Sequence, residues 1–246
     1  MSEIKKISGI IIRKIPFSDS SLILSLYSRE YGKISLIQKG ALRQGKNKIG
    51  SKIDTLNHIE VVIYYKNDRD IQLIKEVDLV NYYPMIKGNL EKLKYCSAIA
   101  ELLNFFIMEN FENEELFLGT IKILSRFEDS KSNDEAELFI RYFLFFIRHT
   151  GFEINFKKCG ICNNEIEDDF ELINFNFEKG FICGDCSQNS FHSFQFSKEL
   201  FKIITCLNFK KEIHSLKELN NIIKFLEQYL RYHVPEFSGL KSLKMF

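Results

Sequence analysis

A chain of 246 residues, of which 45% are hydrophobic and 27% charged, has the composition of a globular protein with room for more than one packed domain. No apolar run approaches the roughly 20 residues that a membrane-spanning helix requires, so a membrane protein is excluded and a cytoplasmic one is expected. The net charge of +1 conceals an uneven distribution, because residues 1–80 carry fourteen Lys and Arg against nine Asp and Glu.

The basic excess is concentrated between residues 31 and 53. A field of this kind suits a polyanion such as nucleic acid, but a solvated basic loop without a partner would look the same. Charge alone leaves both interpretations open. This segment has no acidic residue and six basic ones: Lys33, Lys39, Arg43, Lys46, Lys48 and Lys52.

The first 80 residues predict a small β-barrel. Turn-rich pieces such as PFSDSS and KNDRD separate short runs of apolar, β-branched residues, which is typical of successive strands. Closure into a barrel would remove the exposed strand edges. The long loop between the third and fourth strands fits an OB-fold, although an SH3-like barrel fits nearly as well. The expected strands cover residues 9–15, 22–27, 33–38, 59–65 and 71–80.

The pattern changes to a helical period after Tyr83. Apolar residues at helical spacing predict a first helix over 90–107. Asn113 is expected to cap a second helix, and Ser132 with Glu135 forms a capping box for a third, which Gly151 ends. Further helices are expected to begin at Ser197 and after the capping box of Ser215 and Glu218, the last one ending before Pro235. The region from 81 onward therefore predicts a helical bundle.

Two CxxC pairs interrupt this bundle. They are Cys159 with Cys162 and Cys183 with Cys186, and twenty residues separate them. Each pair can present two thiolates to one cation, and a hairpin turning at 178–180 would bring the pairs together. Four thiolates fill a tetrahedron and leave no position for an activated water, so one structural Zn²⁺ is predicted. The competing interpretations are two disulfides or unrelated free thiols.

No catalytic constellation is predicted. The run from Gly40 to Asn47 resembles a phosphate-binding loop, but Asn47 replaces its final hydroxyl residue and no helix follows. His58 and Glu60 imitate the H-x-E of zinc deaminases, yet the expected metal site has no open position. The other histidines are scattered along the chain. A non-enzymatic protein is therefore expected.

Three stretches together resemble the bacterial recombination mediator family RecO. The first is N-terminal and comprises GIIIRKI from Gly9, FSDSSLIL from Phe17 and SREYGKISLIQKGALR from Ser28. The second is the CxxC…CxxC insert of the zinc-bearing members, and the third is YLRYHV from Tyr229 followed by LKSL from Leu240. The resemblance covers the chain in order. The loop after Gly40 departs from the family's more Arg-rich run, so the resemblance does not define the geometry of that loop.

This resemblance implies a multidomain α+β protein: a five-stranded OB-fold barrel (1–80), a helical domain (81–154 and 191–246) and an inserted four-cysteine zinc finger (155–190). It implies a mediator of DNA repair that binds single-stranded and duplex DNA, anneals complementary strands and helps load recombinase. The implied partners are RecR and the C-terminal tail of single-strand-binding protein, and the implied location is the cytoplasm, at the nucleoid. The residues carried over as facing DNA are Arg13, Arg29, Lys33, Lys39 and Arg43, to which the basic segment adds Lys46, Lys48 and Lys52.

Aromatic residues of the barrel are candidates to stack on bases, since stacking on aromatic side chains is a sequence-tolerant way to hold a single strand. They are Phe17, Tyr27, Tyr31, Tyr64 and Tyr65. Packing in the barrel core or rim is the alternative for each, and it is favoured for Phe17. Two other functions remain open: an OB-fold and zinc-ribbon protein that binds RNA or the ribosome, and an interaction scaffold that needs no nucleic acid.

Overall fold

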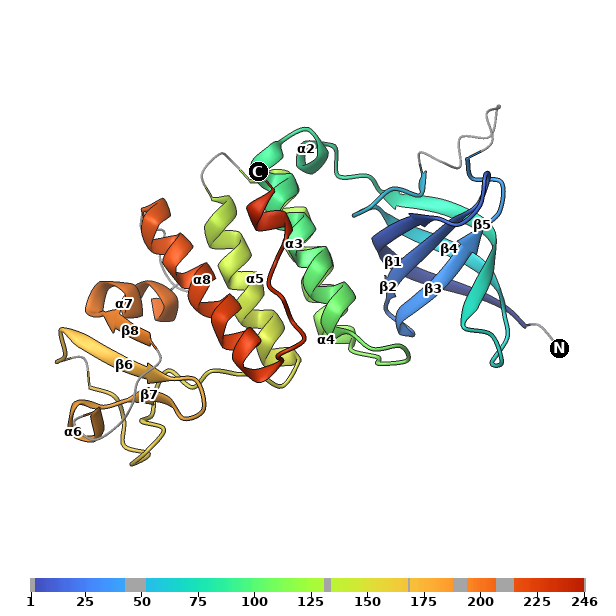
Figure 1. The fold of residues 1–246 in the computed structure, drawn as a ribbon. Helices are drawn as coiled ribbons and strands as arrows, with labels where there is room; N and C mark the ends of the chain where they lie inside the picture. The colour runs from blue at the N-terminus through green and yellow to red at the C-terminus, as the bar shows by residue number, and fades with distance from the viewer. Residues whose placement is uncertain are drawn as a thin grey trace. The chain divides into compact units, whose positions relative to one another are not determined.

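The computed structural model describes residues 3–42, 52–130, 134–167, 169–187, 194–206 and 215–245. The chain forms two compact units, and Figure 1 labels their helices and strands. Unit 1 comprises Met1–Glu135 together with Leu240–Phe246, and unit 2 comprises Ala136–Gly239. None of the helices in the described ranges combines the length and apolar character needed to cross a membrane.

Unit 1 begins with a closed five-stranded barrel in the order β1-β2-β3-β5-β4. β1 pairs with both β2 and β4, and β3 runs parallel to β5. This topology confirms the expected OB-like barrel and all five expected strands, with β1 beginning several residues earlier than predicted. The strands are β1 (Glu3–Pro16), β2 (Leu22–Ser28), β3 (Gly32–Gln38), β4 (His58–Tyr65) and β5 (Ile71–Asn81).

Alternation along the strands builds the barrel core. Every second residue points inward, and Ile11, Leu24 and Leu36 are fully buried there. The register between β1 and β2 shifts between Ile11 and Arg13, so β1 carries a bulge at this point. A bulge inserts one residue and bends the strand. Ile12, the inserted residue, is buried, and the strand beyond it exposes Arg13 and Ile15.

Helices complete unit 1, and their ends follow local capping chemistry. The Asn89 side chain accepts a hydrogen bond from the Lys92 amide, and Asn113 accepts one from Leu116, as predicted for the second helix. Phe117 packs edge-on against Tyr27 of the barrel, with ring centroids 5.7 Å apart. The helical elements are α2 (Pro84–Lys87), α3 (Leu90–Phe106), α4 (Glu114–Asp129) and the 3₁₀ helix η1 (Ser242–Lys244).

The Glu101 carboxylate on α3 fixes η1 within unit 1. It accepts hydrogen bonds from the amides of Lys241 (2.7 Å) and Ser242 (3.0 Å) and from the Ser242 hydroxyl (2.7 Å). Each of these bonds is charge-assisted and therefore stronger than one between neutral groups. The segment after unit 2 is thus anchored to the helix that begins at Leu90.

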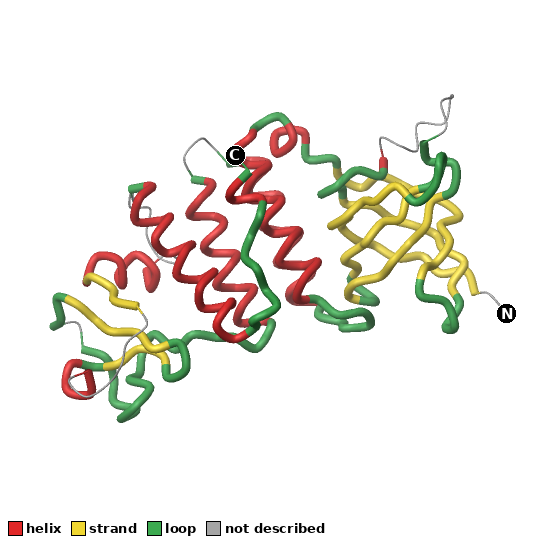
Figure 2. Tube along the Cα trace, in the orientation of Figure 1, coloured by secondary structure: helices red, strands yellow, loops and turns green. Residues whose placement is uncertain are grey.

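Unit 2 combines three longer helices with a small sheet in the order β7-β6-β8 (Figure 2). The predicted hairpin forms, since β6 and β7 are antiparallel and the Asn176 side chain accepts bonds from the amides of Glu178 and Lys179 in the turn. The strand β8 and the short helix α6 were not predicted. The elements are α5 (Glu135–His149), β6 (Leu172–Asn176), β7 (Gly180–Ile182), α6 (Gly184–Ser187), β8 (Phe194–Ser197), α7 (Lys198–Cys206) and α8 (Leu216–His233).

Aromatic packing and caps hold unit 2 together. Phe175, Phe181 and Phe196 from the sheet are buried with Phe225 of α8, and the centroids of Phe196 and Phe225 lie 4.7 Å apart. The capping box at Ser215 is present, α7 follows Ser197, and α8 ends before Pro235, as predicted. Ser132, the expected start of α5's capping box, lies outside the described residues.

Candidate nucleic-acid interface and metal site

Four cysteines of unit 2 converge on one point. The Sγ atoms of Cys159, Cys162, Cys183 and Cys186 all lie within 4.8 Å of one another, and those of Cys162 and Cys183 are 3.7 Å apart. No disulfide joins these four cysteines. Such a cluster of thiols could hold a metal ion. The two CxxC pairs therefore act as one site, as the spacing predicted.

The backbone around Cys159 is shaped for this convergence. The Gly160 amide donates to the Phe181 carbonyl (2.8 Å), and a Cβ at Gly160 would lie 1.6 Å from the Lys179 carbonyl oxygen. Only glycine fits at such a close approach of two chains. The first CxxC turn is thereby pressed against the β6–β7 hairpin that carries the second pair.

The ionisation of these thiols also suits a cation. Burial opposes ionisation of Cys159, but hydrogen bonds from the backbone amides of Cys162, Cys183 and Ile161 outweigh it and lower its pKa to about 6. The hydrogen bond with the Cys183 side chain, followed by partial burial and the other thiols, raises the pKa of Cys186 to about 12. The Cys159 thiolate therefore forms readily, whereas the pKa values of Cys183 and Cys186 are raised by the neighbouring thiols, and a bound cation would favour their ionised form.

The barrel presents a partly open surface on β1, β2 and β3, which we call the outer face. Across β1 and β2, Arg13 pairs with Ser25 and Ile15 pairs with Ile23. Across β2 and β3, Ser25 pairs with Ser35 and Ile23 pairs with Ile37. All six side chains are exposed or half-buried. The outer face is therefore a strip of small and β-branched side chains with one arginine.

The predicted DNA-facing residues fall into three groups: exposed ones, ones with partners inside unit 1, and ones outside the described residues. Arg13 and Lys39 are exposed, and their side chains make no ion pair among the described residues. Arg29 and Lys33 are instead engaged by the helical part of unit 1. Arg29 forms an ion pair with Glu114, the first residue of α4, and the Lys33 ammonium donates to the Asn104 carbonyl (2.9 Å).

Lys52 also has internal partners. Its ammonium donates to the Val77 carbonyl (2.8 Å) and lies 3.5 Å from the Asp78 carboxylate. Arg43, Lys46 and Lys48 lie outside the described residues, and so does most of the run that resembles a phosphate-binding loop. The described part of the basic segment thus offers Lys39 as an exposed cation, while Lys33 and Lys52 are partly committed to the fold.

The stacking candidates separate clearly. Tyr27 is fully buried, so it cannot meet a base, and its hydroxyl has no hydrogen-bond partner among the described residues. Tyr31 and Tyr65 pack on each other at 5.5 Å, and the Lys5 ammonium lies 3.9 Å from the Tyr65 ring centroid. Phe17, for which packing was expected, is 62% exposed. That expectation was wrong, because Phe17 lies in the loop beyond the last pair of β1 and β2.

His58 has a structural environment. Its Nε2 lies 2.8 Å from the Ser8 hydroxyl, and its ring packs near Phe117. Burial lowers the pKa of His58, which favours the neutral imidazole. It belongs to the wall of the barrel, on β4, whereas the cysteines belong to unit 2.

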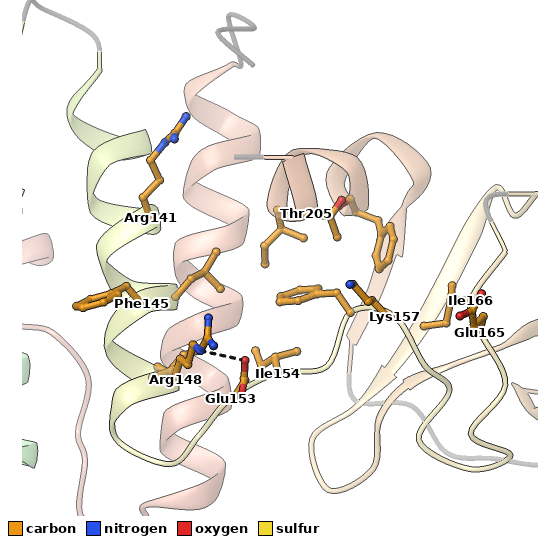
Figure 3. A pocket seen from close by; sticks show the side chains of 14 residues that line it. Arg141, Phe145, Arg148, Glu153, Ile154, Lys157, Glu165, Ile166 and Thr205 are labelled. Atoms are coloured by element: carbon orange, nitrogen blue, oxygen red, sulfur yellow. Dashed lines mark hydrogen bonds and ion pairs between the residues drawn. The ribbon is translucent and has the colours of Figure 1, made fainter. Parts of the chain in front are cut away.

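Unit 2 contains a groove that the sequence did not reveal, with a volume of about 620 Å³. Figure 3 shows its walls: Phe145 and two arginines from α5, Ile154 and Lys157 from the segment that follows, and Thr205 from α7. Arg141 is bonded to Glu137, and Arg148 pairs with Glu153 at 3.4 Å. The Lys157 ammonium makes no ion pair among the described residues. The groove is thus mainly apolar, and Lys157 is the cation of its lining that has no carboxylate partner among the described residues.

Comparison with known proteins identifies the family of this chain. Models of the N-terminal and C-terminal domains of recombination protein O match residues 1–83 and 87–244. The chain is 27% identical to the DNA repair protein RecO of Chloroherpeton thalassium, over 99% of this chain and 98% of the relative. It is 26% identical to that of Mycoplasma mycoides, over 92% and 90%. Together with the barrel and the four clustered cysteines, these matches show that the chain belongs to the RecO family of DNA repair recombination mediators.

Proposed function

We propose that this protein is a non-enzymatic mediator that binds single-stranded and duplex DNA, anneals complementary strands and helps load recombinase onto DNA coated with single-strand-binding protein. The observation that carries the proposal is the outer face of the OB-like barrel, in a chain that both RecO domain models match. OB-folds hold single strands with a positively charged groove and stacking aromatics. RecR is the proposed partner in loading, and the cytoplasm, at the nucleoid, is the proposed location.

The DNA site is proposed to run along the outer face and into the basic segment. Arg13 and Lys39 would bind phosphates without first breaking an ion pair, and Arg43, Lys46, Lys48 and Lys52 would extend the contact. Arg29 and Lys33 would join only when nucleic acid displaces their internal partners. Because phosphate contacts leave base edges free, a strand held in this way can pair with a complementary one.

One structural zinc ion is proposed at the four cysteines. Zn–S bonds of about 2.3 Å make a tetrahedron with sulfur–sulfur edges of about 3.8 Å. The distance of 3.7 Å between the Sγ atoms of Cys162 and Cys183 fits such an edge. The ion would offset part of the thiolate charge and hold the 155–190 region together as a zinc finger, the third part of the proposed division after a barrel and a helical domain.

The groove of unit 2 is proposed to receive the C-terminal tail of single-strand-binding protein, taken as an acidic peptide with an apolar end. Phe145, Ile154 and Ile166 would bury the apolar end, and Lys157 would face the acidic part. Lys157→Glu should then weaken binding of a fluorescent tail peptide by about tenfold or more, since a like charge replaces an opposite one. Lys217→Glu, an exposed lysine of α8 outside the groove, is the matched control.

The central test compares binding of labelled single-stranded DNA, duplex DNA and RNA of matched length. If about four phosphates are neutralised on a single strand, the logarithmic salt slope is about −2.8, and binding weakens roughly 50-fold between 50 and 200 mM salt. A strong preference for RNA would favour the ribosome-associated alternative. Absence of binding to every nucleic acid would leave only a scaffold role.

Annealing is tested with complementary strands coated with single-strand-binding protein and no ATP. The protein should speed annealing, and free tail peptide should slow the reaction of coated strands but not of naked ones. Equal inhibition of both reactions, or a requirement for hydrolysable nucleotide, would overturn the proposed mechanism.

A further inference from the structure

Phe17 exposes its ring to solvent at one end of the barrel strands β1 and β2. It is 62% exposed, although phenylalanine is among the residues most often buried. A single exposed apolar side chain needs no explanation by itself. Three further features of its surroundings point to a ligand: the rigidity of the loop, the adjacent outer face, and the nearby cations.

The loop that carries Phe17 is pinned at both ends. The Phe17 amide donates to the Ser21 carbonyl (3.0 Å), which closes a tight turn between β1 and β2. The Leu42 amide donates to the Ser20 carbonyl (3.1 Å), so the segment after β3 lies against the same turn. A ring on a pinned loop loses little conformational entropy when a ligand stacks on it.

The ring also lies at the end of the outer face. Residues of β1 alternate in direction, and Arg13 and Ile15 share the outer face with Ile23 and Ile37. Phe17 follows Pro16, where β1 and β2 make their last pair with Leu22. A strand lying along the outer face would therefore reach the Phe17 ring at the β1–β2 turn.

Charge on both sides of Phe17 suits a phosphate backbone. Leu22 pairs with Gln38, which brings Lys39 beside the turn, and Arg13 lies along β1. Leu42, 46% exposed, adds apolar surface before the basic segment continues. Asp19, in the turn itself, is the opposing charge. Arg13 and Lys39 thus lie on or next to the strands that lead to this turn, so a strand bound along the outer face would have cations for its phosphates and an exposed ring for a base.

We propose that Phe17 is a base-stacking platform for single-stranded nucleic acid, set at the β1–β2 end of the outer face. This inference rests on the proposed function and adds a residue that charge alone does not reveal. Stacking on an aromatic ring is tolerant of sequence because every base has a flat face. Purines should stack more strongly than pyrimidines, so the effect of Phe17 should be larger on oligo(dA) than on oligo(dT).

The chain contains no tryptophan, which allows a direct optical test. In Phe17→Trp the only indole sits on the proposed platform, and stacking of a base should quench its fluorescence. The quench should saturate at the dissociation constant measured by anisotropy of labelled oligo(dA). Phe111→Trp is the matched control, because Phe111 is 47% exposed in the same unit but lies between Glu109 and Glu112. It should show little quench.

Affinity measurements complete the test. Phe17→Ala should weaken oligo(dA) binding by about 5- to 150-fold, the range that one base–aromatic stack supplies, with an unchanged salt slope. Unfolding in urea should keep the wild-type midpoint, since the ring is exposed. Unchanged affinity of Phe17→Ala, or equal quench in both tryptophan variants, would overturn the stacking role while leaving DNA binding intact. If wild-type protein binds no nucleic acid, the proposed function itself fails.

Discussion

The ion pair between Arg29 and Glu114 offers a sharp test of where nucleic acid binds. The two side chains are about half exposed, at 52% and 56%, and Glu114 opens α4. An exposed pair contributes about 0–1 kcal/mol, and a carboxylate in the first helical turn about 0.3–1 kcal/mol more. Glu114→Gln should therefore cost at most about 2 kcal/mol of stability and leave unit 1 folded.

The same change should free Arg29 for a phosphate. One added contact on a single strand makes the logarithmic salt slope steeper by about 0.7. If Glu114→Gln and wild type bind equally at 1 M salt, this steeper slope makes the variant bind about fivefold more tightly than wild type at 0.1 M salt, provided that Arg29 faces the strand. Both quantities follow from one set of anisotropy titrations at four or five salt concentrations.

Glu112→Gln is the control for this experiment. It removes the same charge two residues earlier, from an exposed side chain that forms no ion pair among the described residues. Long-range electrostatics would make the two variants alike. If Arg29 is released locally, the salt slope should be steeper for Glu114→Gln but not for Glu112→Gln. The double variant Arg29→Gln/Glu114→Gln should then have the same slope as Arg29→Gln. Equal slopes together with equal affinities in wild type and Glu114→Gln would remove Arg29 from the DNA site.

Three further predictions concern the metal, a buried hydroxyl and pH. Purified protein should hold close to one zinc per chain, and less than half an equivalent of metal under reducing, chelator-free conditions would contradict this. Because structural zinc is coupled to the folding of its own module, Cys183→Ser should increase hydrogen exchange over 155–190 while the barrel keeps wild-type protection. Tyr27→Phe should stabilise unit 1 by about 1 kcal/mol in urea unfolding, since it removes a fully buried hydroxyl without a partner among the described residues, and a loss of stability would reveal such a partner. Burial lowers the pKa of His58, so this imidazole takes up a proton more readily in the unfolded chain than in the folded one. The free energy of unfolding should therefore fall as pH drops below about 6.5, and His58→Gln should flatten that dependence.

The sequence predicted the features that depend on neighbouring residues. Strand alternation, the Asn113 cap and the capping box at Ser215 each involve only a few adjacent positions, and all three are present. The convergence of the cysteines was also predictable, because a CxxC pair and a hairpin leave few other arrangements.

Features that depend on distant residues were not predictable in the same way. Arg29 and Glu114 are 85 positions apart, and nothing near Arg29 shows that a carboxylate will meet it. The strand β8 has four residues and exists because it pairs with β6 across the cysteine region. The exposure of Phe17 depends on how the β1–β2 turn closes. The sequence shows that position 17 is a phenylalanine but not whether its side chain is buried or exposed.

The anchoring of η1 by Glu101 has a consequence for the order in which the chain can fold during synthesis. Unit 1 is interrupted, since Leu240–Phe246 emerges from the ribosome only after the whole of unit 2. The barrel and α3 can form early, but the Glu101 carboxylate then waits for the amides of Lys241 and Ser242. Domains generally fold as units during synthesis. Completion of unit 1 is therefore coupled to translation through unit 2, and a chain cut short before Leu240 would keep its barrel but lack the anchor on α3.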